Sequence, residues 1–280
     1  MAEIRFTKMH GIGNDYIYIN CMESTVDDPA SLSVKLSDRH TGIGGDGIIL
    51  ILPSTIADFK MRIFNADGSE ATMCGNGSRC VAKYVYDHGL TDRKVITLET
   101  LSGIKTLSLH AGADGLVDEV TVDMGEPAFG AGAIPVRCQS ATMVDAPVDT
   151  SRGDVRLTAV SMGNPHGVVF VDSLDKVDFL TLGPELERHP MWPDRANIEF
   201  VEAISRERLK MRVWERGSGE TMACGTGACA TAVAAALTGR CAREVTVSLR
   251  GGDLRIKWGD DGHVYMTGPA TEVFDGVVKI

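Results

Sequence analysis

The sequence predicts an α+β protein of two strand-rich domains, each with one principal helix. Three observations predict this fold class. The stretch EATMCGNGSRCVAK, which begins at Glu70, is repeated 150 residues later as ETMACGTGACATAV, which begins at Glu220. Strand-like runs dominate both halves of the chain, and each half has one long helical pattern beside its copy of the repeat. A chain of 280 residues is also long enough for about two domains.

The repeat extends beyond these two stretches in one register. Composition alone would match about one position in fifteen, so a cluster of identities is informative. The same offset also aligns Gly13-Asn14 with Gly163-Asn164. We interpret the chain as two halves that derive from one ancestral unit. The identical pairs around the repeat are Met61/Met211, Arg62/Arg212, Glu70/Glu220, Cys74/Cys224, Gly75/Gly225, Gly77/Gly227, Ala82/Ala232 and Gly89/Gly239.

Strands are expected where β-branched and aromatic residues alternate with polar ones or form short apolar runs. In the first half these segments are 4–7, 15–20, 47–52, 59–64, 94–99 and 117–124. In the second half they are 155–160, 167–172, 197–204, 209–215, 243–249, 253–258 and 263–268. The region 125–152 is rich in Gly, Ala and Pro, and we expect it to connect the two halves.

The two principal helices are expected from Asn76 to His88 and from Thr226 to Thr238, each followed by a glycine that can end it. Their first residues are good N-cap residues, so Cys74 and Cys224 are expected just before a helix N-terminus. Shorter helices are expected to start near Pro29 and Pro184, because proline fits the first helical turn.

The composition argues against several classes of function. A formal net charge of -10 argues against a nucleic-acid-binding or anionic-membrane-binding surface. The N-terminus carries charges where a signal peptide needs an apolar run, and no apolar run of about 18 residues occurs. We therefore expect a soluble, cytoplasmic protein. The seven cysteines include no C-x-x-C pair, so neither a zinc site nor a structural disulfide is expected.

Cys74 and Cys224 are candidate reactive groups because of their place before a helix. A helix N-terminus stabilises a thiolate through its unpaired N–H groups and its dipole. The glycines that follow leave room for backbone N–H groups to approach an anion such as a carboxylate. A carboxylate-binding turn beside a thiolate suits an amino-acid substrate.

The duplication suggests how the two thiols act together. Two equivalent halves that face one another would place an acid/base group on each side of one cleft. One thiol group would remove the α-proton while the other delivers a proton to the opposite face, which inverts the carbon. A lone cysteine is more often a small buried residue. We keep that structural interpretation for Cys21, Cys80, Cys138, Cys229 and Cys241.

Four motifs, in order and spread over nearly the whole chain, closely resemble those of diaminopimelate epimerases. They are MHGIGNDY (Met9–Tyr16), FNADGSEATMCGNGSRC (Phe64–Cys80), SMGNPH (Ser161–His166) and ERGSGETMACGTGACA (Glu215–Ala230). The resemblance implies an isomerase that interconverts LL- and meso-2,6-diaminopimelate without pyridoxal phosphate or any other cofactor and without a metal. Such an enzyme supplies lysine biosynthesis and a peptidoglycan precursor.

The resemblance also implies a fold of two pseudo-symmetric domains, each a mixed sheet curved around a central helix. The expected domain limits are 1–124, joined by 270–280, and 125–269. A homodimer is expected on the resemblance alone, and the expected binding partner is a small-molecule amino acid.

Residue by residue, the resemblance implies that Cys74 and Cys224 are the catalytic thiols, assisted by His166 and Glu215 respectively. Further residues are implied to bind the substrate through backbone amides, side-chain amides and a guanidinium. These substrate-binding residues are Asn14, Asn65, Gly75, Asn76, Asn164, Asn197, Glu215, Arg216, Gly225 and Thr226. Two positions depart from some family members: Gly47 replaces Gln, and the residues that follow Asn197 are larger.

Other functions remain open. A proline or hydroxyproline racemase would use the same thiol pair, but proline has no distal carboxylate for Arg216 to bind. A redox switch would instead join Cys74 and Cys224 in a disulfide, and a binding module would hold an amino acid without turnover. Exchange of solvent hydrogen into an amino acid distinguishes the isomerases from both.

Overall fold

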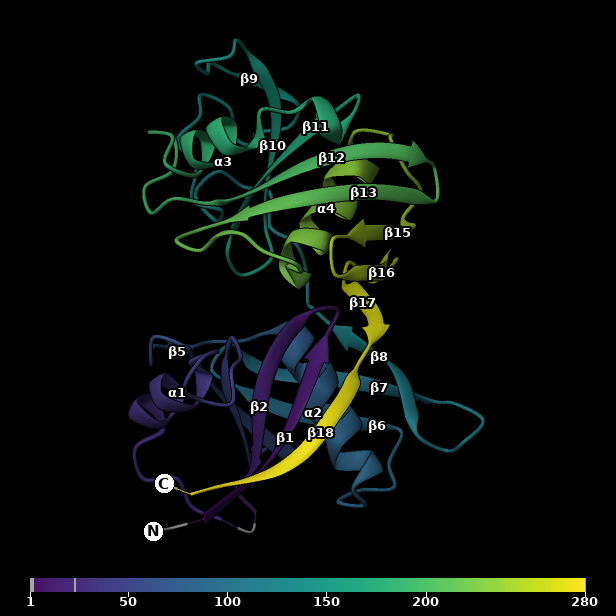
Figure 1. Ribbon diagram of the computed structural model, residues 1–280. Helices are drawn as coiled ribbons and strands as arrows, with labels where there is room; N and C mark the ends of the chain where they lie inside the picture. Colours follow the sequence, from purple (N-terminus) through teal and green to yellow (C-terminus); the bar gives the residue numbers. More distant parts are fainter. Residues whose placement is uncertain (1–2, 23, 280) are drawn as a thin grey trace. The chain divides into compact units, whose positions relative to one another are not determined.

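The chain divides into two compact units, each of α+β class, which confirms the expected fold class. A computed structural model describes residues 3–22 and 24–279 (Figure 1). Unit 1 comprises Met1–Asp123 and Thr267–Ile280, and unit 2 comprises Met124–Met266. Among the described residues, no helix has the length and apolar character needed to cross a membrane.

The elements of the first half follow the order expected from the sequence, with additional strands. They are β1 (Glu3–Gly11), β2 (Asn14–Asn20), α1 (Pro29–Ser37), β3 (Gly47–Leu52), β4 (Phe59–Asn65), β5 (Glu70–Ala71), α2 (Gly75–Asp87), β6 (Val95–Thr100), β7 (Gly103–Ala111) and β8 (Val117–Asp123). The short strand β9 (Ala146–Val148) lies in the region expected to connect the halves.

The second half repeats this order. It contains β10 (Val155–Ser161), β11 (Pro165–Val171), a 3-10 turn (Leu174–Lys176), α3 (Phe179–Glu187), β12 (Asn197–Ser205), β13 (Arg208–Glu215), β14 (Gly219–Glu220), α4 (Gly225–Leu237), β15 (Glu244–Leu249), β16 (Gly252–Trp258) and β17 (Val264–Pro269). The last strand, β18 (Thr271–Lys279), belongs to unit 1 and pairs antiparallel with β1.

The duplication is visible in the strand pairing. In unit 1, β1 and β2 are antiparallel, β2 and β3 parallel, β3 and β4 antiparallel, and β4 and β6 parallel. In unit 2 the same pattern joins β10 to β11, β11 to β12, β12 to β13, and β13 to β15. A bidentate ion pair also recurs, between Arg62 and Glu70 and between Arg212 and Glu220. Each unit therefore has the mixed sheet expected from the resemblance.

Each principal helix is enclosed by strands of its own unit. Helix α2 contacts β1, β2, β7, β8 and β18, and α4 contacts β10 to β13, β15 and β16. Most of the side chains on both helices are buried as a result. The central strands are buried as well: GIILIL of β3 is almost wholly inaccessible, as is usual for a strand covered on both faces.

The expected N-caps of the principal helices are wrong by two positions. Helix α2 starts at Gly75 and α4 at Gly225, so Cys74 and Cys224 are themselves the N-cap residues. Both cysteines have extended backbone angles, as an N-cap requires. Asn76 and Thr226 lie inside the first turn, where their side chains are available for other contacts.

The shorter helices agree with the sequence in one case only. Helix α1 starts at Pro29, behind the N-cap Asp28, as expected. Helix α3 starts at Phe179 and contains Pro184, so the expected start near Pro184 is wrong. The proline leaves the carbonyl of Leu180 without its helical donor, but Leu180 is 72% exposed and water can take that place.

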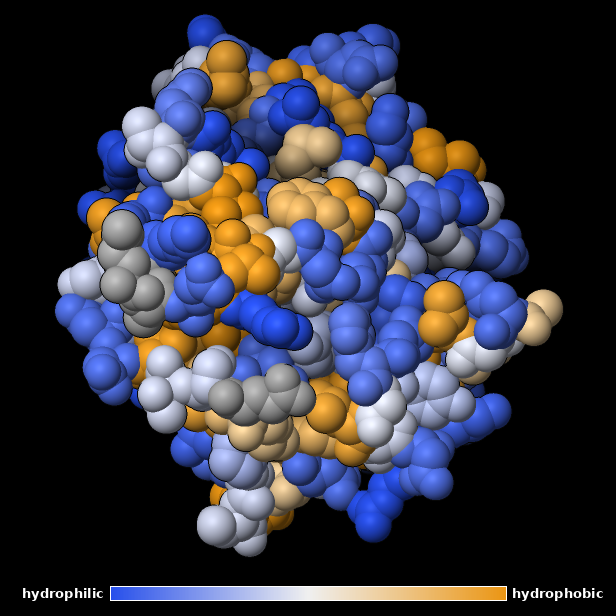
Figure 2. Space-filling view, turned by 60° about the horizontal axis from the view of Figure 1, so that its bottom comes forward, coloured by the Kyte–Doolittle hydropathy of each residue, from blue (hydrophilic) through white to orange (hydrophobic). Residues whose placement is uncertain are grey.

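Two long strands, β7 and β18, were not expected. Strand β18 is exposed along most of its length, and its large apolar residues Val273, Phe274 and Val277 are each about half exposed. It therefore lacks the alternation of buried and exposed residues from which strands are usually inferred. Figure 2 shows that apolar side chains gather in patches between hydrophilic ones on the face that it draws.

The structure gives a physical reason for glycine at position 47. Gly47 pairs with Asn65 across β3 and β4, and a Cβ at Gly47 would lie 2.1 Å from the carbonyl oxygen of Phe64. The sheet fixes this oxygen, so the clash cannot be relieved cheaply. In this protein, the backbone around Gly47 leaves no room for a side chain.

We expect Gly47→Ala to lower the free energy of unfolding by about 3 kcal/mol, because the added methyl group overpacks a fixed backbone. Urea denaturation measures the loss. Gly115→Ala is the matched control: its φ is +84° and nothing lies within 4 Å of the added Cβ. Only the cost of the left-handed conformation, about 1 kcal/mol, is then expected. Equal losses in the two variants would contradict the steric explanation.

Candidate active site

In unit 1, the thiol of Cys74 caps helix α2. The backbone angles of Cys74 are φ -139° and ψ 113°, and its Sγ accepts a hydrogen bond from the backbone N–H of Gly77 at 3.3 Å. This contact needs a close approach between the cysteine and the first helical turn. A Cβ at Gly77 would lie 3.6 Å from the sulfur, an ordinary contact, but only 2.6 Å from Cδ1 of Ile49, so Ile49 leaves no room for a side chain here. The sulfur is thus held against the positive end of the helix dipole.

Two predicted asparagines lie beside this thiol. Cys74 Sγ donates to Oδ1 of Asn14 at 3.3 Å, and Nδ2 of Asn76 donates to the same oxygen at 3.4 Å. Nδ2 of Asn14 donates to Oδ2 of Asp46 at 2.7 Å, which fixes the orientation of the Asn14 amide. Asn65, another predicted site residue of unit 1, has a different partner: its Nδ2 donates to Oγ of Ser69 at 3.1 Å.

In unit 2, Cys224 occupies the equivalent N-cap of α4 but makes different contacts. Its side chain forms no capping hydrogen bond. Its Sγ instead lies 3.6 Å from Oγ1 of Thr226, and it is 7% exposed. A Cβ at Gly227 would lie 3.2 Å from this sulfur, so the glycine allows a close approach.

Burial, together with two nearby carboxylates, favours the protonated form of Cys224. Glu215 ends β13 and accepts a hydrogen bond from Oγ1 of Thr221. Burial raises the pKa of Glu215, although Thr221, His166 and Cys224 each lower it. Burial also raises the pKa of the Cys224 thiol well above its usual value, and the charges of Glu215 and Glu199 raise it further. Cys224 is therefore a protonated thiol at neutral pH.

His166 and Glu199 form a fully buried pair next to this site. Nδ1 of His166 lies 2.7 Å from Oε1 of Glu199, and both side chains are 0% exposed. Nε2 of His166 lies 3.0 Å from Oδ1 of Asn164, and Nδ2 of Asn164 donates to Oγ1 of Thr226 at 3.4 Å. Three of the predicted site residues, Asn164, His166 and Thr226, therefore lie together in unit 2.

Asn197 and Arg216 are linked through the backbone. The N–H of Arg216 donates to Oδ1 of Asn197 at 2.9 Å, and Nδ2 of Asn197 donates to the carbonyl of Pro165 at 3.2 Å. The exposed guanidinium of Arg216 contacts the carbonyl of Asp194 through Nη1 at 3.2 Å. An exposed, positively charged fork of this kind can bind a carboxylate.

Gly75 and Gly225 are the first residues of α2 and α4. The N–H groups of a first helical turn have no partner inside the helix and can bind an anion. Each cysteine therefore lies directly before backbone donors that a carboxylate could use.

Glu199 is the residue of this site that the sequence interpretation missed. The offset that pairs the two cysteines also pairs Glu199 with Ile49, His166 with Tyr16, and Glu215 with Asn65. Two glutamates and a histidine thus stand in the second half where isoleucine, asparagine and tyrosine stand in the first. That break in the repeat is the signal that would have found Glu199.

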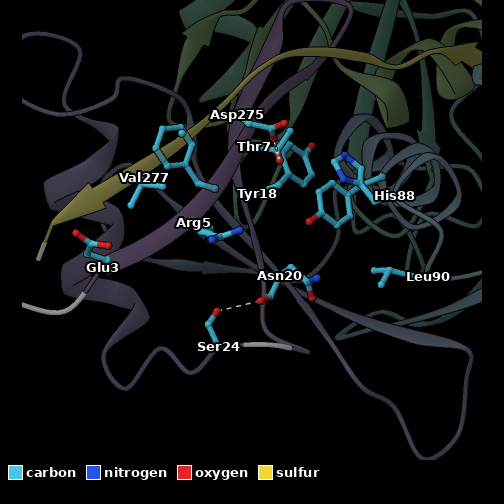
Figure 3. A pocket seen from close by; sticks show the side chains of 13 residues that line it. Glu3, Arg5, Thr7, Tyr18, Asn20, Ser24, His88, Leu90, Asp275 and Val277 are labelled. Atoms are coloured by element: carbon cyan, nitrogen blue, oxygen red, sulfur yellow. Dashed lines mark hydrogen bonds between the residues drawn. The ribbon is translucent and has the colours of Figure 1, made fainter.

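Unit 1 also has a cavity of about 660 Å³, whose lining includes none of these residues (Figure 3). It is lined mainly by β1, β2, β18 and the end of α2, and Thr7 Oγ1 donates there to Oδ1 of Asp275 at 2.5 Å. His88, Glu272 and Asp275 bring potential metal ligands within 4.8 Å of one another. Nε2 of His88 and Oε2 of Glu272 lie 2.9 Å apart, a hydrogen-bond distance that needs no ion to explain it.

Comparisons with known proteins identify relatives over the full chain. A family model described as diaminopimelate epimerase matches residues 6–130 and 158–273. The chain is 55% identical over 278 residues to the diaminopimelate epimerase of Acetivibrio thermocellus, with 99% of each chain covered. It is 57% identical over 279 residues to that of Phocaeicola vulgatus, again with 99% of each covered.

Solved structures with similar folds are more distant in sequence. A phenazine biosynthesis protein of the PhzF family from Bacillus anthracis has a TM-score of 0.71 at 18% identity, with all of both chains covered. A hydroxyproline epimerase from Agrobacterium vitis has a TM-score of 0.69 at 17% identity, with 99% of this chain and 91% of that chain covered. These similarities establish the two-unit fold.

Proposed function

The chain belongs to the diaminopimelate epimerase family, and from this premise we propose that it interconverts LL- and meso-2,6-diaminopimelate. The chain is more than half identical, over nearly its full length, to relatives of that name. The observation that carries the proposal is the pair of N-cap cysteines, Cys74 and Cys224, at equivalent helix starts in the two units.

The proposed reaction is a proton transfer on each face of one α-carbon. In one direction, the thiolate of Cys74 removes the α-proton and the thiol of Cys224 delivers a proton to the opposite face. Cys74 ends as a thiol and Cys224 as a thiolate, and the reverse direction exchanges these roles. The protonated state of Cys224 supports it as the acid in the resting enzyme.

The negative charge that develops during proton removal needs stabilisation. We assign this to the first-turn N–H groups of α2 and α4, at Gly75, Asn76, Gly225 and Thr226, which would bind the reacting carboxylate. The side-chain amides of Asn14, Asn65, Asn164 and Asn197 and the guanidinium of Arg216 would hold the remaining amino and carboxylate groups. A bidentate arginine contact suits the distal carboxylate.

The test is incubation of LL-diaminopimelate with the purified protein in deuterated water without added pyridoxal phosphate. We expect the meso form to appear with deuterium at the inverted α-carbon, because that carbon receives its proton from a thiol that has exchanged with solvent. NMR spectroscopy measures both changes. Absence of deuterium from the amino acid would overturn the proposal.

Proline is the matched control substrate, since it lacks the distal carboxylate that Arg216 would bind. We expect no exchange into proline. Exchange into proline but not into diaminopimelate would identify a proline racemase instead. A Cys74–Cys224 disulfide without exchange into any amino acid would identify a redox switch.

A further inference from the structure

We propose that Glu199 is a positioning residue that holds His166 as a doubly protonated imidazolium and thereby fixes the amide orientation of Asn164. The inference rests on the proposed function and adds a residue to its site. The resulting buried ion pair is present in the second half of the duplicated chain and has no equivalent in the first.

Both ring nitrogens of His166 lie within hydrogen-bond distance of an oxygen atom. Nδ1 faces the Glu199 carboxylate at 2.7 Å, and Nε2 faces the carbonyl oxygen of the Asn164 amide at 3.0 Å. With Glu199 ionised and the Asn164 amide oriented in this way, both partners are acceptors, and an imidazolium donates to both. A neutral ring would leave a buried nitrogen lone pair against an oxygen, which is unfavourable where no water reaches.

The surroundings of Glu199 stabilise its negative charge. A Cβ at Gly227 would lie 2.6 Å from Oε1 of Glu199, so the carboxylate packs against the first turn of α4. The positive end of a helix dipole favours an anion at this place. Oε2 of Glu199 is buried without a hydrogen-bond partner among the residues that the structure describes, so the charge depends on His166 and on the helix.

The pair is connected to Cys224 through side chains. From Glu199 the contacts run through His166 to Asn164, then at 3.4 Å to Oγ1 of Thr226, and at 3.6 Å to Sγ of Cys224. Because the Nε2 proton of His166 occupies Oδ1 of Asn164, Nδ2 of that amide is directed to Thr226. Loss of that proton would favour a flip of the amide, which would change the donor presented to Thr226.

The first half lacks this arrangement at every matched position. Tyr16 stands for His166 and Ile49 for Glu199, and Ile49 packs on Gly77 as Glu199 packs on Gly227. Asn14 is instead oriented by Asp46 and contacts the Cys74 sulfur directly. Each half therefore orients its equivalent asparagine, but only the second does so with a buried histidine.

The charge state of His166 depends on the groups that face it. Glu199 contacts it from β12, and Glu215 on β13 interacts with it electrostatically. Cys224 at the start of α4 is affected by both carboxylates.

The direct test is nitrogen-15 NMR of the free protein labelled at histidine, with His166→Gln to assign the signal. We expect both ring nitrogens of His166 to carry protons at neutral pH in the wild type, and one to lose its proton in Glu199→Gln. A neutral His166 in the wild type would overturn the inference without any need for the variant to fold. This readout is independent of turnover, so it also separates this inference from the proposed epimerase activity.

Turnover gives the second readout. We expect Glu199→Gln to lower kcat by about 10- to 100-fold, as when a histidine loses its orienting carboxylate, with little change in KM. Glu199→Asp should recover part of the loss. Glu202→Gln is the matched control on the same strand, because Glu202 only accepts a hydrogen bond from the N–H of Leu174. Unchanged kcat and an unchanged His166 signal in Glu199→Gln would contradict the proposal.

Discussion

Replacement of either Cys74 or Cys224 by alanine is expected to reduce interconversion of LL- and meso-diaminopimelate by about 10³-fold or more. Inversion needs a proton acceptor on one face of the carbon and a donor on the other, so one remaining thiol cannot complete it in either direction. The appearance of the meso form, followed by NMR or chiral chromatography, measures the effect. Continued turnover in either variant would exclude the two-thiol mechanism.

The two variants are expected to differ in stability, which provides a check on the structure. Cys74 accepts a capping hydrogen bond from Gly77, whereas Cys224 forms no capping bond. Cys74→Ala should therefore lose about 1 kcal/mol of unfolding free energy through the missing cap, and Cys224→Ala should lose none by this route. Cys138→Ala is the matched control, because Cys138 is exposed and lies in neither site.

Replacement of Glu215 by glutamine is expected to lower kcat by about 10²- to 10³-fold. The amide can still accept the hydrogen bond from Thr221, but it cannot take the proton of Cys224, which general base catalysis requires. The pH dependence of kcat tests this role. Burial raises the pKa of Glu215, and only its ionised form is a base. Wild-type activity should therefore fall on acidification at a higher pH than for an ordinary glutamate.

In Glu215→Gln this acidic limb should be lost, because the group that titrates has been removed. Glu244→Gln, on strand β15, is the control for the same chemical change at an exposed position. An acidic limb that is identical in the wild type and in Glu215→Gln would assign the titration to another group and contradict the role of Glu215.

The sequence could predict where Cys74, Cys224 and the helices after them lie, because the repeat has a strong local pattern there. The glycines that flank Cys74 and Cys224, and the helical spacing after them, are local features, so both helices start within one residue of the prediction. The N-caps were placed on Asn76 and Thr226 because these residue types usually cap helices. Cys74 and Cys224 occupy the N-cap positions instead, and in unit 1 the Cys74 sulfur accepts the capping hydrogen bond from Gly77.

The parts that could not be predicted depend on contacts between distant segments. Glu199 lies in an ordinary strand pattern, and only folding brings it onto His166 and α4. Strand β18 is exposed along most of its length, and it forms because β1 offers it a partner for backbone hydrogen bonds. Pro184 resembles a helix start in sequence, yet α3 tolerates it because water can reach the carbonyl that it leaves unpaired.

The pairing of β1 with β18 has a consequence for biosynthesis. Strand β1 is translated before unit 2, and its partner β18 is translated after it. Unit 2 can thus assemble before unit 1 is complete. One edge of β1 stays unpaired until β18 has left the ribosome.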